Sequence, residues 1–64
     1  MIYIPDSYNT KDWTNVVLEK PITEDQYNLL QSQQGGMFHI HRAGTAIKFE
    51  RKEDAEWFLL RLQQ

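Results

Sequence analysis

The chain has 64 residues, which is room for one domain, and a formal net charge of −2 at pH 7. It contains no cysteine, which excludes disulfides and cysteine-based zinc sites and favours a reducing compartment such as the cytoplasm. The mild acidity disfavours a dedicated duplex-binding domain, because such domains are usually clearly basic.

Two short strands are predicted in the N-terminal part. Residues 1–4 are apolar and predict a first strand, and residues 13–20 predict a second. In the second segment Val16 and Leu18 lie on one side of the strand and Val17 lies on the other. A proline follows each segment and ends it.

Next comes a helix from residue 24 to residue 33 or 34. Thr23, followed three residues later by Gln26, matches a capping box at its start. Gly35 and Gly36 are expected to end it, because glycine enters the left-handed conformation without a Cβ penalty.

Residues 37–50 predict a β-hairpin with Ala43-Gly44 as its two-residue turn. In this register the apolar side chains pair across the strands, as Phe38 with Phe49 and Ile40 with Ile47. The other face carries Met37, His39, His41, Ala46, Lys48 and Glu50. A three-residue loop would mix apolar and polar residues on each face, so the two-residue turn is preferred.

A second helix follows the hairpin. Its core-facing stripe at helical spacing is predicted to contain Ala55, Phe58, Leu59 and Leu62. Trp57 and Leu60 widen the apolar surface beyond that stripe. These two side chains are therefore either the edge of the core or a surface for a partner.

The predicted fold class is α+β, as a single domain over residues 1–64. The order (β)βαββα indicates a small antiparallel sheet with two helices on one face. It resembles a truncated or permuted split β-α-β arrangement, which is the ferredoxin-like topology. Residues 1–4 are then a candidate replacement for the missing last strand.

One resemblance is to RNA-recognition-motif domains. Residues 42–49 resemble the basic-and-aromatic strand motif of that family, and residues 53–55 resemble the usual start of its second helix. However, Gly44 and Ala46 stand where the family places its two stacking aromatics. The resemblance therefore does not imply base stacking on this strand.

A second resemblance covers roughly the last third of the chain. Residues 47–50 and 53–61 look like the closing segment of many small accessory proteins of tailed bacteriophages. In those proteins a strand ending in Phe-Glu leads into a helix that begins Asp-Ala and carries Phe-x-Leu-Arg. The resemblance implies a phage origin and the host cytoplasm as the location, but no mechanism.

No chemical centre is predicted. His39 and His41 share one face of a strand and have a spacing that can bind zinc, copper or nickel, but two ligands alone do not make a site. We therefore predict no metal and no cofactor, and we read the pair as half-exposed histidines on a solvated face. No nucleophile stands beside a recognisable base, so no enzyme activity is predicted. No apolar run approaches the length of a membrane span.

Two function classes remain. The first is a protein-interaction module whose partner is a host protein or a second copy, because small folds without disulfides or metals often gain stability by association. Its candidate contact residues are the surplus apolar and aromatic side chains Tyr3, Tyr8, Trp13, Trp57 and Leu60.

The alternative is a nucleic-acid-binding regulator that uses the hairpin face. Its candidate residues are His39, His41, Arg42, Lys48, Arg51 and Lys52. Each set also has a purely structural explanation. The apolar and aromatic residues can belong to the core, and the basic residues can form an ordinary solvated face.

Overall fold

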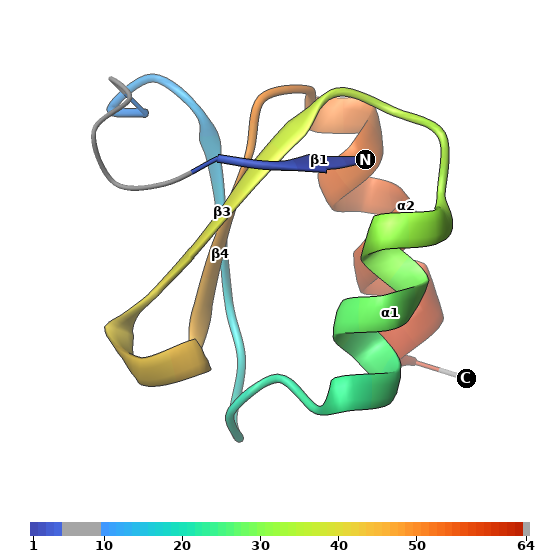
Figure 1. Ribbon diagram of the computed structural model, residues 1–64. Helices are drawn as coiled ribbons and strands as arrows, with labels where there is room; N and C mark the ends of the chain where they lie inside the picture. Colours follow the sequence, from blue (N-terminus) through green and yellow to red (C-terminus); the bar gives the residue numbers. More distant parts are fainter. Residues whose placement is uncertain (5–9, 64) are drawn as a thin grey trace.

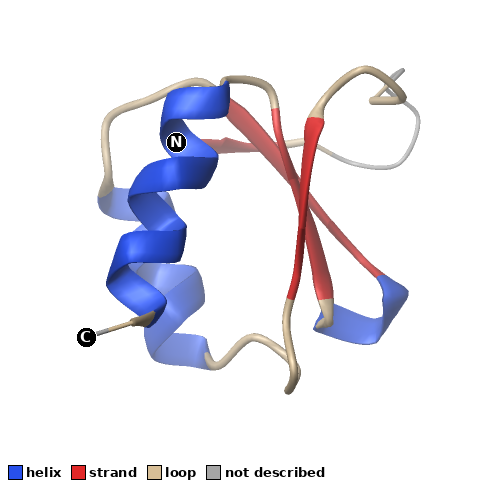
Figure 2. Ribbon diagram, turned by 180° about the vertical axis from the view of Figure 1, so that it is seen from behind, coloured by secondary structure: helices blue, strands red, loops and turns tan. Residues whose placement is uncertain are grey.

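The computed structural model describes residues 1–4 and 10–63. Its elements in chain order are β1 (Ile2–Tyr3), β2 (Thr14–Val17), α1 (Glu24–Ser32), β3 (Met37–His41), the 3-10 turn η1 (Arg42–Gly44), β4 (Ala46–Phe49) and α2 (Lys52–Leu62). The strands form one sheet in the order β1-β3-β4-β2. Both helices cover the same face of that sheet (Figures 1 and 2). The predicted α+β class is confirmed.

The sheet is mixed, which corrects one detail of the prediction. β4 is antiparallel to both of its neighbours, β3 and β2, so β2-α1-β3 is a split β-α-β unit. β1 runs parallel to β3 at the opposite edge from β2. In the ferredoxin-like arrangement the last strand instead pairs with the outer side of the strand that corresponds to β2. Residues 1–4 therefore do not take the place of that missing strand.

The hairpin has the predicted register. Phe38 lies opposite Phe49 and Ile40 lies opposite Ile47. At the turn, the Thr45 amide donates to the Arg42 carbonyl over 3.2 Å. The two central residues have positive φ angles, 56° at Ala43 and 89° at Gly44, as a type I′ turn requires. Residues with a Cβ carry a penalty in this conformation, and Arg42 also has a positive φ, of 55°, so the turn is strained at two positions.

The first helix begins as predicted and ends slightly earlier. Thr23 Oγ1 accepts from the Gln26 amide over 3.1 Å, and the Gln26 side chain accepts from the Thr23 amide over 2.9 Å. The residue after the helix, Gln33, is extended, and neither of the glycines that follow has a positive φ. Gly35 is needed for a different reason. A Cβ there would lie 2.8 Å from a carboxylate oxygen of Asp54.

The core lies between the sheet and the two helices. Its buried members are Met1, Val16, Leu30, Phe38, Ile47, Phe49, Ala55 and Phe58. Leu59 and Leu62 were predicted to join them, and this is wrong, because they are 42% and 37% exposed. Asp54 is buried instead and accepts the Gly36 amide over 2.8 Å. This bond holds the side of α2 that carries Asp54, Ala55 and Phe58 toward the sheet and turns Leu59 outward. Leu62 continues the inward stripe, but it is the last residue of the helix and remains 37% exposed there.

Candidate functional site

The two histidines lie on the face of the sheet away from the helices, but they are not both half-exposed as predicted. His39 is only 5% exposed, because it lies in a row of stacked rings, with centroids 6.0 Å from Tyr3 and 5.8 Å from His41. Its Nδ1 donates to the Ile4 carbonyl over 2.8 Å, since a carbonyl oxygen can only accept. His41 Nε2 lies 3.1 Å from Asn15 Oδ1. The pair thus connects the central hairpin to both sheet edges.

These contacts give the histidines a structural role. Among residues 1–4 and 10–63, no group of three or more His, Cys, Asp or Glu side chains is placed to hold a metal ion. The described part of the chain likewise contains no buried side-chain polar atom without a hydrogen-bond partner.

The basic candidates of the nucleic-acid alternative are spread along the hairpin. Arg42 is exposed at the turn, whereas Arg51 and Lys52 are exposed beyond the far end of β4. Lys48 lies between them on the outer face, where its Nζ is 3.4 Å from Thr10 Oγ1. The structure does not bring these cations together into one patch.

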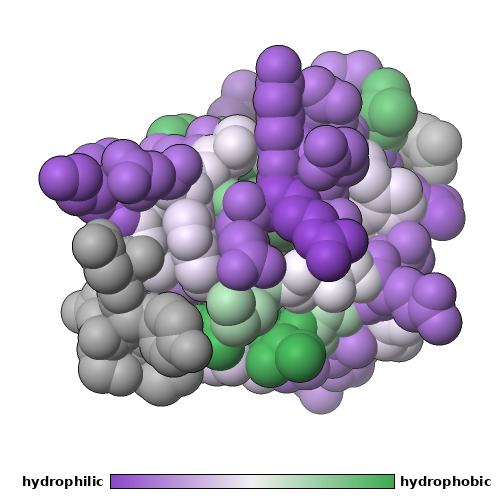
Figure 3. All heavy atoms as spheres, turned by 90° about the horizontal axis from the view of Figure 1, so that it is seen from above, coloured by the Kyte–Doolittle hydropathy of each residue, from purple (hydrophilic) through white to green (hydrophobic). Residues whose placement is uncertain are grey.

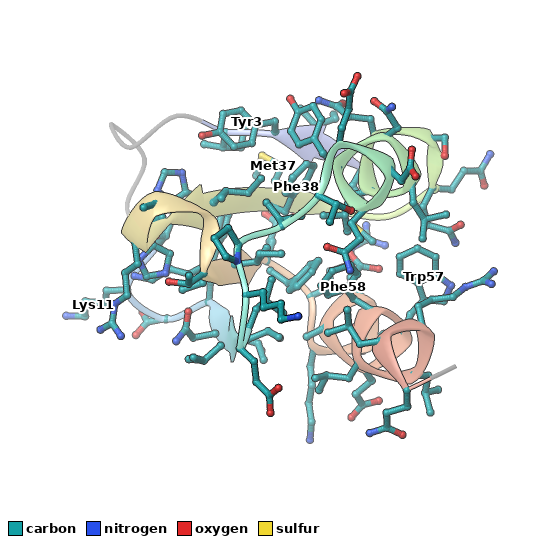
Figure 4. All side chains as sticks on the ribbon, turned by 90° about the horizontal axis from the view of Figure 1, so that it is seen from below. Tyr3, Lys11, Met37, Phe38, Trp57 and Phe58 are labelled. Carbon is teal, nitrogen blue, oxygen red and sulfur yellow. The ribbon has the colours of Figure 1, made fainter. Side chains whose placement is uncertain are left out.

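The aromatic candidates are also separated. Trp57 is partly buried against the core and lies between the two helices, while Tyr3 is on the β1 side of the molecule (Figure 4). Tyr3 packs edge-on against the rings of Tyr27 and Phe38. Trp13 is half-buried just before β2, and Leu60 is 63% exposed on α2. Tyr8 lies outside the described residues.

A different feature stands out, namely the outer edge of β2. The Leu18 amide donates over 2.7 Å to the carbonyl of Thr45, the residue just before the neighbouring strand β4. Because backbone groups alternate between the two sides of an antiparallel strand, the amides and carbonyls of Asn15 and Val17 point outward. No other strand in the described part of the chain pairs with them.

Apolar side chains flank this edge on both faces of the sheet. Val17 is 65% exposed on the face away from the helices. Leu59 and Leu62 flank the edge on the helix face, because α2 packs over β2. Leu59 is two residues from Trp57 and therefore about 200° around the helix from it, on the side away from α1.

Beside the edge is an open hollow of about 510 Å³. It is lined by Val17, Leu18, Glu19, Lys20, Pro21, Thr23, Gln26 and Leu62. The surface seen from above is mostly hydrophilic, with apolar atoms in small separate groups (Figure 3).

Part of this edge was visible in the sequence. Two consecutive valines in a predicted strand must face opposite sides, which placed Val17 away from Val16. The exposure of Leu59 and Leu62 had no such signal, since both fit the core-facing stripe of α2 by spacing alone.

Comparison with protein-family models, with curated proteins and with solved structures finds no match for this chain. The two resemblances seen in the sequence therefore rest on their own residues. No helix in the described residues is long and apolar enough to cross a membrane. What the chain does has to be inferred from the geometry of its surface.

Proposed function

We propose that this chain is a protein-interaction module that binds an extended segment of another chain along the outer edge of β2. The observation that carries the proposal is the outward-facing backbone of Asn15 and Val17, which is flanked by exposed apolar side chains on both faces of the sheet. Strand addition of this kind uses main-chain hydrogen bonds for affinity and alternating side-chain contacts for selectivity.

The chemistry of β2 suits this role. Natural sheets usually protect an exposed edge with charged residues, prolines, bulges or very short strands. β2 has the sequence Thr-Asn-Val-Val over four residues, with no charge and no proline. An added strand would place alternate side chains against Leu59 and Leu62 on one face and against Val17 on the other.

The topology supports the same position. The outer side of β2 is where the ferredoxin-like arrangement has its last strand, and α2 ends beside it at Leu62. An additional strand is therefore compatible with this side of the sheet, where no described strand pairs with β2.

The resemblance to phage accessory proteins extends the proposal to a host protein as the partner, in the host cytoplasm. The nucleic-acid alternative has less geometric support, because its cations are spread along the hairpin and His39 is buried. It demands binding that weakens steeply with rising salt, whereas strand addition between uncharged segments does not.

Backbone amide exchange tests the edge directly. In the isolated monomer the outward amides of Asn15 and Val17 should exchange quickly, and those of Val16 and Leu18, which face β4, should exchange slowly. Binding of a partner strand should slow the two outward amides selectively. A complex in which they still exchange freely contradicts the proposal.

A pair of variants tests the same edge by capture from host lysate. Val17→Pro removes an outward amide and leaves the bonds to β4 in place, and proline is tolerated at such edge positions. Leu60→Lys is the control, since Leu60 is equally exposed on α2 but does not flank the edge. Proteins captured by the natural chain and by Leu60→Lys should be lost with Val17→Pro. Unchanged capture by Val17→Pro contradicts strand addition.

A further inference from the structure

We infer that the extended segment bound at this edge is β2 of a second copy of the chain. The inference rests on the proposed strand addition at the β2 edge and places a second copy there in preference to a host protein. The two β2 strands run antiparallel about a two-fold axis at Val16. Two four-stranded sheets then join into one continuous sheet.

The sheet pleat restricts the register. Thr14 and Val16 pair with core residues of β4 and so face the helices, while Asn15 and Val17 face away. A continuous sheet requires residues on the same face to stand opposite each other. Even-numbered residues must therefore oppose even-numbered ones, which excludes the register that sets Asn15 against Val16.

Chain geometry selects one of the allowed registers. The chain turns just before β2, where the Trp13 amide donates to the Thr10 carbonyl over 3.0 Å, so the extended segment is 14–18. Val16 is the middle of that segment. Pairing about Val16 uses all five residues and sets the outward backbone of Asn15 against that of Val17 in the second copy. Pairing about Asn15 would instead leave Val17 and Leu18 opposite residues 13 and 12, which lie outside the extended segment.

The flanking charges agree with this register. Asp12 lies in the turn before the extended segment and Lys20 lies in the bend after it. Antiparallel pairing about Val16 therefore places Asp12 of one copy and Lys20 of the other at the same end of the joined strands, and the two-fold axis repeats this at the opposite end. Opposite charges in such positions favour a pairing.

The exposed leucines have a place in the same assembly. α2 packs over β2, so a two-fold axis at Val16 brings the two α2 helices side by side on the helix face of the joined sheet. Leu59 is 42% exposed on the side of α2 away from α1 and is positioned to meet its counterpart there, while Leu62 lies beside the β2 edge with Val17 and Leu18. The interface then combines a strand pair with a small apolar helix contact, and homodimer interfaces are in general more apolar than transient ones.

Sedimentation of the purified chain tests the dimer. The mass should change from monomer to dimer as concentration rises through the micromolar range. Val17→Pro and Leu62→Lys should each stay monomeric throughout, with helix and sheet signals in circular dichroism that match the natural chain. A monomer at every concentration, or a dimer that survives Val17→Pro, overturns the inference.

A charge exchange tests the register. Asp12→Lys alone and Lys20→Asp alone should each weaken the dimer by about fivefold to tenfold, because each replaces two attractive contacts with two repulsive ones. The double variant should restore the natural dissociation constant. Loss in both single variants without restoration in the double variant contradicts the register about Val16.

The results separate this inference from the proposed function. A chain that stays monomeric but captures a lysate protein through the β2 edge, in a way that Val17→Pro abolishes, leaves strand addition standing and removes the second copy as the partner. A dimer that shows slow exchange at the Asn15 and Val17 amides supports both.

Discussion

The two edges of this sheet are built in opposite ways. β1 is two residues long, runs parallel to β3 and is held by its neighbours on several sides. The Ile2 amide donates to Gly36 over 3.2 Å, and the Ile4 amide donates to Phe38 over 2.8 Å. The α-amino group of Met1 lies 3.1 Å from the Leu30 carbonyl, near the C-terminal end of α1, where a positive charge is favoured.

β2 is longer, and its outer backbone groups have no strand partner among the described residues. Its neighbours Val17, Leu59 and Leu62 are 65%, 42% and 37% exposed. The difference suggests that contacts at the β1 edge stabilise the fold, while residues at the β2 edge are available for association. Substitutions should therefore have different consequences at the two edges.

The largest effect is expected at the centre, on which both edges depend. Phe49 is fully buried and stands opposite Phe38 on one side and Thr14 on the other. Phe49→Ala should lower the free energy of unfolding by about 3–5 kcal/mol, enough to unfold much of a domain this small. Chemical denaturation measures this. A change below about 1 kcal/mol would show that the core is assigned wrongly.

The next largest loss of stability is expected from Asp54→Ala, and it should act on the β1 side of the sheet. It leaves the buried Gly36 amide without its acceptor and lowers the free energy of unfolding by about 1–3 kcal/mol. Glu53→Ala, at the exposed neighbouring acid in the same helical turn, is the control for the helix dipole and should have a much smaller effect. Amide exchange should accelerate at Ile4 more than at Leu18. Equal acceleration at both contradicts a local role for Asp54.

The sequence predicted the fold better than it predicted the surface. Alternation along residues 37–50 gave the hairpin register, and the Thr23 and Gln26 pair gave the helix start, because both signals act over a few residues. The position of β1 depends on contacts with residues more than thirty positions away, such as Ile4 with His39. No local pattern encodes a contact of that kind.

The residues of the candidate site were also predicted incompletely from local sequence patterns. Trp57 and Leu60 were singled out because they exceeded the expected stripe of α2, yet Trp57 packs on the core while Leu59, which fitted the stripe, is exposed. Helical spacing defines which side chains share a face. It does not define which face turns inward, and here the buried bond from Asp54 to Gly36 helps to decide that.

Tyr3→Ala should destabilise the β1 edge by about 1–2 kcal/mol, because Tyr3 makes edge-on contacts with two rings, at 6.3 Å from Tyr27 and 5.5 Å from Phe38. Tyr3→Phe keeps the ring and should leave the unfolding midpoint close to that of the natural chain. If both variants lose stability equally, the hydroxyl rather than ring packing is what holds this edge.

A stabilising change is expected at the turn between β3 and β4. Ala43→Gly relieves the Cβ strain at a φ of 56° but increases the freedom of the unfolded chain. The net gain should be about 0.5–1 kcal/mol. Because the turn joins the two inner strands, amide protection should rise similarly at both edges. Ala43→Val is the control with the opposite expected sign. It should lower the free energy of unfolding, since a β-branched residue is disfavoured at positive φ.

The smallest effect on folding is expected at the β2 edge. Val17→Ala removes a side chain that is 65% exposed, so the monomer should lose no more than about 0.5 kcal/mol. The measurement has to be made at a concentration low enough that any self-association is absent, because association adds to apparent stability. Repeated at high concentration, the difference between natural chain and variant should grow, since Val17 then contributes to an interface. A loss of several kcal/mol in the dilute monomer would show that both edges hold the fold, and that the difference between them is only one of strand length.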